Sequence, residues 1–317
     1  MSIIPPYIAR EMAVLVPTKD RPGHVHRLLE SLERQVAGAG QIIVVDGGES
    51  VEDVVRSFEG RLPVEWHPCL PPGQIRQRKL GLKKLAPYIR LVSLFDDDMV
   101  LDPYAIQKMI SMWNSVEPET AGIGYNLVNC PKHIYRKHYA AFFMSSPRAG
   151  EVLTSGFVTP LGNIDSNIQV QWLGGGYTSW RRSIVTEIAQ EEISTRWAVG
   201  EDVRFSYPIG KNQPLYVCAS AKVQEENLGD YALPENLAGY QGRKWALAQL
   251  YLVSQHKELS TWRCLWMIFG STLLKFGVGL LRNNKTARKA AYGQFGALLI
   301  YLRTRLANNS IKTLLED

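Results

Sequence analysis

Residues 89–98 read IRLVSLFDDD, a mostly apolar run that leads directly into three aspartates. The run has the length and composition of a buried β-strand. Three further runs of this kind precede it: MAVLVP at 12–17, QIIVVD at 41–46 and a weaker one at 62–67. The first hundred residues therefore predict four buried strands.

Three amphipathic stretches separate these runs: 22–36, 51–58 and 74–85. Apolar runs that alternate with amphipathic helices are the pattern of βαβ units, so the sequence predicts an α/β fold, Rossmann-like, with a doubly wound and mostly parallel sheet flanked by helices. Ligands of such sheets bind beyond the carboxyl ends of the strands. Polar residues at 17–21, 46–48 and 96–98 follow three of the predicted strand ends.

The rest of the chain has a loop-rich part and a helical part. Residues 121–170 are rich in Pro, Gly, Ser, Asn and Tyr, as expected for loops and short strands that shape a specificity pocket. Further elements are predicted as helices at 181–187 and after Gly200, and as a strand at 214–219. From residue 230 the pattern is helical. We therefore predict a sheet domain over 1–228 and a helical, basic region over 229–317.

The composition is that of a folded protein, with 45% hydrophobic and 21% charged residues. Its four cysteines are scattered without a CxxC pair, which argues against disulfides or a thiolate zinc site and favours a reducing compartment. The first residues lack a signal-peptide pattern. The longest charge-free stretch of the apolar tail, Cys264–Leu274, is 11 residues long, against about 20 for a spanning helix. We expect a cytoplasmic protein without a spanning helix.

The net charge of +6 resides in the C-terminal tail, where residues 259–315 hold nine Lys and Arg residues and no acid. Apolar side chains recur there at helical spacing: Trp262, Trp266, Phe269, Leu273, Phe276 and Leu280. Such a stripe with basic flanks is typical of a helix on an anionic membrane surface, so we expect peripheral association with the inner face of the cell membrane, and no nucleic-acid partner. Packing on the catalytic domain or on a partner subunit, such as a second copy of the chain, is the alternative.

Three adjacent carboxylates at 96–98 repel one another, which costs stability unless a cation or hydrogen-bond donors compensate. A polar turn that caps the next helix is the alternative, although Asp102-Pro103 already supplies a cap and a first helical proline. Carboxylate oxygens suit Mg²⁺ or Mn²⁺, and Mg²⁺ commonly uses one or two carboxylates together with substrate phosphates. In extended geometry Asp96 and Asp98 point to one side and Asp97 to the other. The pair Asp96 and Asp98 would then serve a nucleotide and a metal.

Four segments together carry a family resemblance: VPTKDRPGHVHRLLESL at 16–32, IIVVDGG at 42–48, QRKLGL at 77–82 and LFDDDMVLDP at 94–103. In this order they resemble the family 2 glycosyltransferases, inverting enzymes of the GT-A fold that act in polysaccharide and O-antigen assembly. The resemblance covers residues 12–103 and resumes at 172–211. It implies transfer of a sugar from a UDP- or dTDP-linked donor to a hydroxyl of a saccharide or lipid-linked acceptor, with Mn²⁺ or Mg²⁺ as cofactor.

The resemblance implies roles for residues at the strand ends. Pro17 and Thr18 match a segment that contacts the base. Asp46 matches an acid that reads the imide edge of uracil or thymine, and a plain turn before Gly47-Gly48 is the alternative. Asp96 is expected to hold the ribose and to share the metal with Asp98.

Arg78 matches the arginine of the family's A-R-N-x-G segment near the nucleotide, although Lys79 stands where the family has asparagine. For Lys79 we favour a solvated helix face. The candidate donor ligands are Pro17, Thr18, Asp20, Arg21, Asp46, Arg78, Asp96 and Asp97.

On the acceptor side, LGGGYTSWRR at 173–182 resembles the family's glycine segment, which borders the donor sugar and the acceptor; a flexible linker is the alternative. Gly175 and Trp180 are the candidates there, since an aromatic face suits sugar stacking. Glu201 and Asp202 resemble the family's E-D motif, with Asp202 as general base and Glu201 as acceptor ligand. Acids that merely favour a helix N-terminus, by about 0.3 to 1 kcal/mol each, are the alternative.

The implied reaction is a single displacement. Asp202 removes a proton from the acceptor hydroxyl, whose oxygen attacks the anomeric carbon, while the metal and Arg78 stabilise the departing nucleoside diphosphate. Many family members place a further metal-binding histidine after the next strand. Gln224-Glu225-Glu226 occupies that region here, and Glu225 is the substitute considered.

Two other functions fit part of the sequence. A sugar-nucleotide nucleotidyltransferase shares the layered fold and the metal carboxylates, but residues 17–21 are not the Gly-rich basic loop of that class. A non-catalytic membrane- or RNA-binding protein would depend on the basic tail alone.

Overall fold

The structure is a computed structural model that describes residues 5–187, 200–226 and 234–306. Contacts divide the chain into two units, and each is described by itself. The first comprises residues 1–132, 161–192 and 205–228, and the second comprises 133–160, 193–204 and 229–317. Among the described residues, 133–160 and 200–204 precede residue 228 and are grouped with the helical unit. The division predicted at residue 228 stays a prediction.

The first half of the sheet is parallel. Its strands are β1 (Met12–Thr18), β2 (Gln41–Asp46), β3 (Val64–Pro68) and β4 (Leu91–Phe95). They lie in the order β3-β2-β1-β4, and each neighbouring pair is parallel. Each strand coincides with one of the four predicted apolar runs, so the predicted α/β fold class is confirmed.

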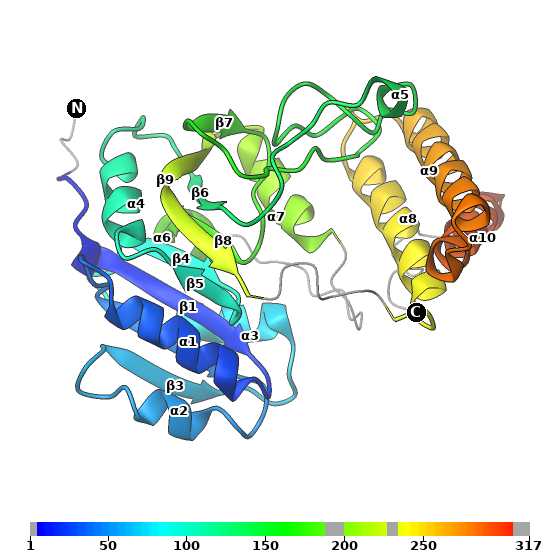
Figure 1. The fold of residues 1–317 in the computed structure, drawn as a ribbon. Helices are drawn as coiled ribbons and strands as arrows, with labels where there is room; N and C mark the ends of the chain where they lie inside the picture. Colours follow the sequence, from blue (N-terminus) through cyan, green and yellow to red (C-terminus); the bar gives the residue numbers. More distant parts are fainter. Residues whose placement is uncertain (1–4, 188–199, 227–233, 307–317) are drawn as a thin grey trace. The chain divides into compact units, whose positions relative to one another are not determined.

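Helices cover both faces of these strands (Figure 1). One face carries α1 (Pro22–Glu33), α2 (Glu52–Arg56) and α4 (Ala105–Trp113); the other carries α3 (Gln74–Lys83), α6 (Arg182–Glu187) and α7 (Glu201–Gly210). Strand β1 is buried on both sides because its side chains alternate between two cores. Val14 and Val16 join the first core, and Ala13 and Leu15 join the second.

The other half of the sheet is mixed. Its strands are β5 (Met99–Leu101), β6 (Gly122–Leu127), β7 (Ile168–Val170), β8 (Tyr177–Arg181) and β9 (Leu215–Glu225). They continue from β4 in the order β8-β6-β9-β5, and β7 also pairs with β9. Strand β8 is antiparallel to both β4 and β6, whereas β6 and β9 are parallel. The described residues thus form one nine-stranded sheet.

The segment after the aspartates differs from the prediction. Strand β5 follows them at once, because its backbone groups pair with β9. Helix α4 begins at Ala105, not at Pro103, and Asp102 Oδ1 accepts a hydrogen bond from the Tyr104 backbone N–H at 3.0 Å in the turn before it. Two short elements complete the first two-thirds of the chain, the 3-10 helix η1 (Ala9–Glu11) and α5 (Lys137–Ala140).

The second unit is helical, as predicted for the tail. It contains α8 (Ala238–Gln255), α9 (Thr261–Leu281) and α10 (Lys285–Leu306). Helices α8 and α10 approach so closely that a Cβ on Gly293 would lie 1.9 Å from the carbonyl oxygen of Gly239. Only glycine permits this contact.

Helix α9 is 21 residues long, and its most apolar 18-residue window has a mean hydropathy of 1.7, so its length and composition suffice to cross a membrane. The expectation of a chain without a spanning helix stays a prediction, because length and composition alone do not show a span. That expectation rested only on stretches without any charged residue. It therefore did not consider the longer apolar run of α9, which contains two isolated basic residues, Arg263 and Lys275. One such helix is weak grounds for a membrane span, because core helices of soluble proteins pass the same criterion, and 33% of its apolar window is buried.

Candidate active site

The carboxyl ends of three neighbouring strands meet at one edge of the sheet. Thr18 of β1 lies in register with Asp46 of β2, and β4 beside them leads into the aspartates. An open pocket of about 290 Å³ lies at this edge. Its lining residues are Pro17, Thr18, Lys19, Arg21, Gln74, Gln77, Asp96, Asp97 and Asp98. Six of these nine were predicted donor or metal ligands, and Lys19, Gln74 and Gln77 were missed.

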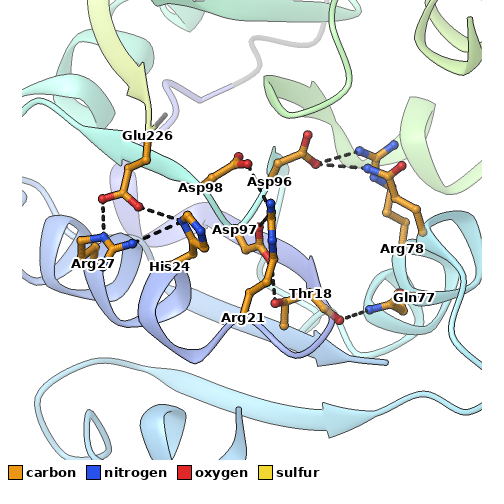
Figure 2. Close-up of polar contacts among 11 residues, drawn as sticks. Thr18, Arg21, His24, Arg27, Gln77, Arg78, Asp96, Asp97, Asp98 and Glu226 are labelled. Atoms are coloured by element: carbon orange, nitrogen blue, oxygen red, sulfur yellow. Dashed lines mark hydrogen bonds and ion pairs between the residues drawn. The ribbon is translucent and has the colours of Figure 1, made fainter. Parts of the chain in front are cut away.

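Asp97 links the aspartate segment after β4 to the end of β1. It accepts hydrogen bonds from Thr18 Oγ1 at 2.6 Å and from Arg21 Nη1 at 2.6 Å (Figure 2). Burial raises the pKa of the Asp97 carboxyl above its usual value, although the bonds from Thr18 and Arg21 act in the opposite direction. The Arg21 guanidinium also lies 3.2 Å from Asp98 Oδ2. Arg21 therefore offsets part of the repulsion that the sequence implies.

Asp96 faces the open side of the pocket, with a side chain that is 39% exposed. It accepts a hydrogen bond from Gln74 Nε2 at 3.1 Å and lies 3.4 Å from Arg78 Nη2. The same Arg78 nitrogen donates to the Gly175 carbonyl at 3.0 Å. The structure therefore brings the predicted residues Arg78, Asp96 and Gly175 together, although they come from three separate segments.

Gln77 is a buried residue that ties three segments together. Its Nε2 donates to the carbonyls of Thr18 and Val45, each at 2.7 Å. Its Oε1 accepts from the Gly73 backbone N–H at 3.3 Å. Gln77 thus holds the ends of β1 and β2 at the start of α3. Its position directly before Arg78 in the quoted QRKLGL segment was the signal that could have marked it.

Asp46 and Asp20 lie behind this pocket and do not line it. Asp46 is fully buried, and its two oxygens accept from the Gly48 backbone N–H at 2.8 Å and from Trp66 Nε1 at 3.4 Å. Asp20 has a positive φ of 54°, and its Oδ1 accepts from the Glu49 backbone N–H at 3.3 Å. Both carboxylates thus hold the turn that follows β2. The base contact predicted for Asp46 and the donor contact predicted for Asp20 stay predictions.

An ion-pair cluster borders the site where β9 ends. Glu226 accepts from His24 at 2.8 Å and from Arg27, and its backbone N–H donates to the Asp98 carbonyl at 2.8 Å (Figure 2). Burial alone would raise the pKa of Glu226, but the bonds from Arg27 and His24 outweigh it and hold this pKa below its ordinary value. The cluster fixes the end of β9 beside the aspartates.

Glu225 precedes this cluster and adds negative charge near Asp96 and Asp98. Burial, followed by the charges of Asp98 and Asp96, raises its pKa above the ordinary value. Over residues 5–187, 200–226 and 234–306, no group of three His, Cys, Asp or Glu side chains is arranged as a ready metal site. The oxygen donors present fit a metal that takes only one or two carboxylates and completes its shell with phosphate and water.

Trp180 lies in the core. It is on β8, is 1% exposed, and packs against Phe205 with ring centroids 5.1 Å apart. Gly122 of the neighbouring strand makes room, since a Cβ there would lie 2.6 Å from the indole ring. A sugar therefore cannot stack on Trp180 as the ring is placed. The glycine segment leads first into β8, whose Thr178, Ser179 and Trp180 are all buried, and the predicted helix follows this strand as α6.

Glu201 and Asp202 begin α7, where Glu201 is buried and Asp202 is half-buried. Both fall in the second unit, while the pocket belongs to the first. Their placement at a helix N-terminus agrees with the dipole alternative as well as with the catalytic one. The roles of general base and acceptor ligand stay predictions.

Comparisons with known proteins bear on this geometry. The sequence matches the profile of Glycosyl transferase family 2 over residues 13–184, more than half of the chain. No curated protein sequence matches significantly. The fold is similar to that of the mannosyltransferase PcManGT from Pyrobaculum calidifontis in complex with GDP-Man and Mn²⁺, with a TM-score of 0.55 and 12% identity over 98% of this chain and 91% of that one. It is also similar to S. aureus TarS 1-349 in complex with UDP, with a TM-score of 0.50 and 13% identity over 86% and 73%.

Proposed function

The chain belongs to glycosyl transferase family 2, and from this premise we propose that it is an inverting, metal-dependent enzyme that uses a UDP- or dTDP-linked sugar. The acceptor is a hydroxyl of a saccharide or of a lipid-linked saccharide. The observation that carries the proposal is the pocket at the ends of β1 and β4, where Asp96 and Asp98 stand beside two arginines. Opposite charges at such short range suit a diphosphate bound through a cation.

The carboxylate oxygens at the pocket support Mn²⁺ or Mg²⁺ as the cofactor. Asp98 and Asp96 would hold the ion, and the charge of Glu225 lies close enough to favour it further. When bound, the ion would neutralise the charge that develops on the departing diphosphate. PcManGT, whose fold is similar, was solved with Mn²⁺.

The chain's own residues would bind and orient the donor. Arg78 is buried and oriented by the Gly175 carbonyl, so its guanidinium needs little reorganisation to stabilise a diphosphate. Pro17 and Thr18 also line the pocket, and the family resemblance would put them in contact with the base. Both carboxylate oxygens of Asp46 already accept hydrogen bonds, one from Gly48 and one from Trp66. The proposal that the enzyme recognises a pyrimidine therefore rests on the family resemblance.

Asp202 would act as the general base and Glu201 would bind the acceptor, with Gly175 at the border of the donor sugar. Transfer then inverts the anomeric configuration, because one oxygen displaces one leaving group. We place the enzyme at the cytoplasmic periphery of the cell membrane, where lipid-linked acceptors are exposed.

The test is a thermal-shift and calorimetric titration with UDP, dTDP and GDP, each with and without Mn²⁺. GDP is included because PcManGT was solved with GDP-Man. Asp98→Ala should abolish the Mn²⁺-dependent part of binding and lower transferase activity by about a hundredfold or more. Asp53→Ala, at an exposed position on α2, is the matched control.

Unchanged Mn²⁺-dependent affinity in Asp98→Ala would refute the site. Incubation with a sugar phosphate and a nucleoside triphosphate separates the nucleotidyltransferase alternative, for which release of pyrophosphate is diagnostic.

A further inference from the structure

Helix α9 presents a stripe of large apolar side chains to solvent. The stripe is the one predicted from spacing, and all six members are exposed: Trp262, Trp266, Phe269, Leu273, Phe276 and Leu280. Trp262 is 75% exposed and Leu280 is 57% exposed. Contiguous apolar surface of this kind is rare on soluble monomers and marks an interaction site.

The opposite face of α9 is also apolar, and it is used for packing. Cys264, Met267 and Ile268 are fully buried there. The helix is therefore hydrophobic around most of its circumference, while the described residues of the helical unit cover only one side. The demands of folding thus do not account for the exposed stripe.

Helix α10 repeats the arrangement. Tyr292, Phe295, Leu299 and Leu302 are exposed on one side, whereas Ala291 and Ala297 are buried. The rings of Phe276 and Tyr292 meet edge to face at 6.1 Å. The stripes of α9 and α10 therefore join into one surface, here called the apolar face.

A third segment borders the apolar face near the start of α9. Trp266 donates to the Ala141 carbonyl at 3.0 Å and stacks on Phe142 at 5.6 Å. Within residues 133–144, Ile134 and Tyr135 are exposed, and they lie next to the cations Arg136 and Lys137 of the α5 region. Figure 1 shows α5 beside the N-terminal end of α9.

The charge around the apolar face is mostly positive, although Glu235 pairs with Lys289 of α10 at 2.8 Å. Residues 259–315 contain no acid, and neither do residues 133–144. Arg263, Arg282, Lys285 and Arg303 are exposed at or near the ends of α9 and α10. Two copies joined through this face would bring their cations together, whereas an anionic bilayer would neutralise them.

We propose that the apolar face and residues 133–144 form one surface that seats the helical unit in the plane of an anionic phospholipid bilayer, with α9 lying in the interface rather than crossing it. The proposal deepens the peripheral location within the proposed function, and it does not require that the donor site be correctly assigned.

The contacts of α9 support the in-plane arrangement. The Gln294 side chain is fully buried and bonds to Ser271 Oγ at 3.2 Å and Thr272 Oγ1 at 3.3 Å. Moving α9 across a bilayer without α10 would separate these groups and leave a buried amide without partners. The exposed aromatic side chains need only about 5–10 Å of insertion to be covered.

The test is flotation of the full chain with neutral phosphatidylcholine vesicles and with vesicles that also contain phosphatidylglycerol. The chain should float with the anionic vesicles, and binding should weaken steeply with salt. The triple variant Trp262→Ser, Phe269→Ser, Leu299→Ser should weaken binding about tenfold or more. Arg282→Gln with Lys285→Gln and Arg303→Gln should lower binding to anionic vesicles selectively.

The matched control replaces three exposed apolar residues of the other unit, Ile8→Ser, Val36→Ser and Tyr104→Ser, and should bind vesicles normally. The thermal shift induced by nucleotide is measured without vesicles and reports whether a variant is folded with an intact donor site. A variant that loses vesicle binding but keeps this shift has therefore lost only the function of the apolar face. The proposal is overturned if the Trp262, Phe269 and Leu299 variant binds vesicles as well as the control variant does. Resistance of the bound chain to alkaline carbonate extraction, which indicates a spanning helix, overturns it too. Conversion of a dimer to a monomer in the α9 and α10 variant, with vesicle binding unchanged, also overturns it.

Discussion

Gly176 lies directly against the carboxylate of Asp96. A Cβ on residue 176 would stand 2.1 Å from Asp96 Oδ2, and the Asp96 backbone N–H donates to the Gly176 carbonyl at 3.0 Å. The glycine segment therefore forms the wall that determines where Asp96 points. This gives its third glycine a steric role that flexibility alone would not require.

Gly176→Ala should displace Asp96 and lower Mn²⁺-dependent nucleotide affinity by about tenfold to a hundredfold, because small misplacements of a ligand group are costly. Isothermal titration with and without Mn²⁺ measures the change. Gly38→Ala is the control, since a Cβ there meets nothing within 4 Å. An unaltered affinity in Gly176→Ala would mean that Asp96 does not contact the ligand.

Gln77→Ala should cost about 1–3 kcal/mol of unfolding free energy, because it leaves the buried carbonyls of Thr18 and Val45 without their shared donor. Gln77→Glu should cost more, since it turns a carboxylate toward the same two carbonyls. Urea unfolding measures both. The exposed Gln107→Ala should stay within about 0.5 kcal/mol of the parent, and a Gln77→Ala value as small as that would contradict the positioning role.

Trp180→Ala should destabilise the fold by about 3–5 kcal/mol, as expected when a large buried side chain is deleted. Trp180→Phe should retain much of that stability. Measuring both the unfolding free energy and the acceptor KM separates a packing role of Trp180 from the predicted sugar contact. A raised KM at full stability would restore the predicted sugar contact and show that the ring leaves the core in the complex.

Glu226→Gln should change stability in a pH-dependent way. The pKa of Glu226 is lowered from 4.5 in the folded state, so the charged pair stabilises the fold above about pH 4.5 and this contribution is lost as pH falls through the folded-state pKa. We expect a loss of about 1 kcal/mol at pH 7 and none at low pH. Urea unfolding at both pH values tests this, with exposed Glu119→Gln as the control. A loss that persists in acid would point to packing as its cause.

Asp202→Asn should lower kcat by about a hundredfold or more while nucleotide affinity stays unchanged, if Asp202 is the general base. Glu201→Gln should act mainly on the acceptor KM. Steady-state kinetics with the donor identified by the nucleotide screen measure both. A normal kcat in Asp202→Asn would assign the two acids to the helix terminus alone.

Local pattern was sufficient for much of the fold. Short apolar runs separated by amphipathic helices predicted β1 to β4, because burial on both faces of a parallel strand leaves a nearly continuous apolar signature. Strand β5 was missed, since three residues after a turn carry too little periodicity. Its existence depends on pairing with β9, more than a hundred residues further along the chain.

Three features follow from the order of the residues: aspartates emerge at a strand end, an α/β sheet presents them, and an apolar basic tail follows. Four other features become visible only in the folded chain: Asp97 binds Arg21, Asp46 holds a turn, Gln77 joins two strands, and Trp180 lies in the core. Those roles depend on which distant groups come within hydrogen-bond or van der Waals reach. Chain folding sets such distances, and spacing along the sequence does not encode them.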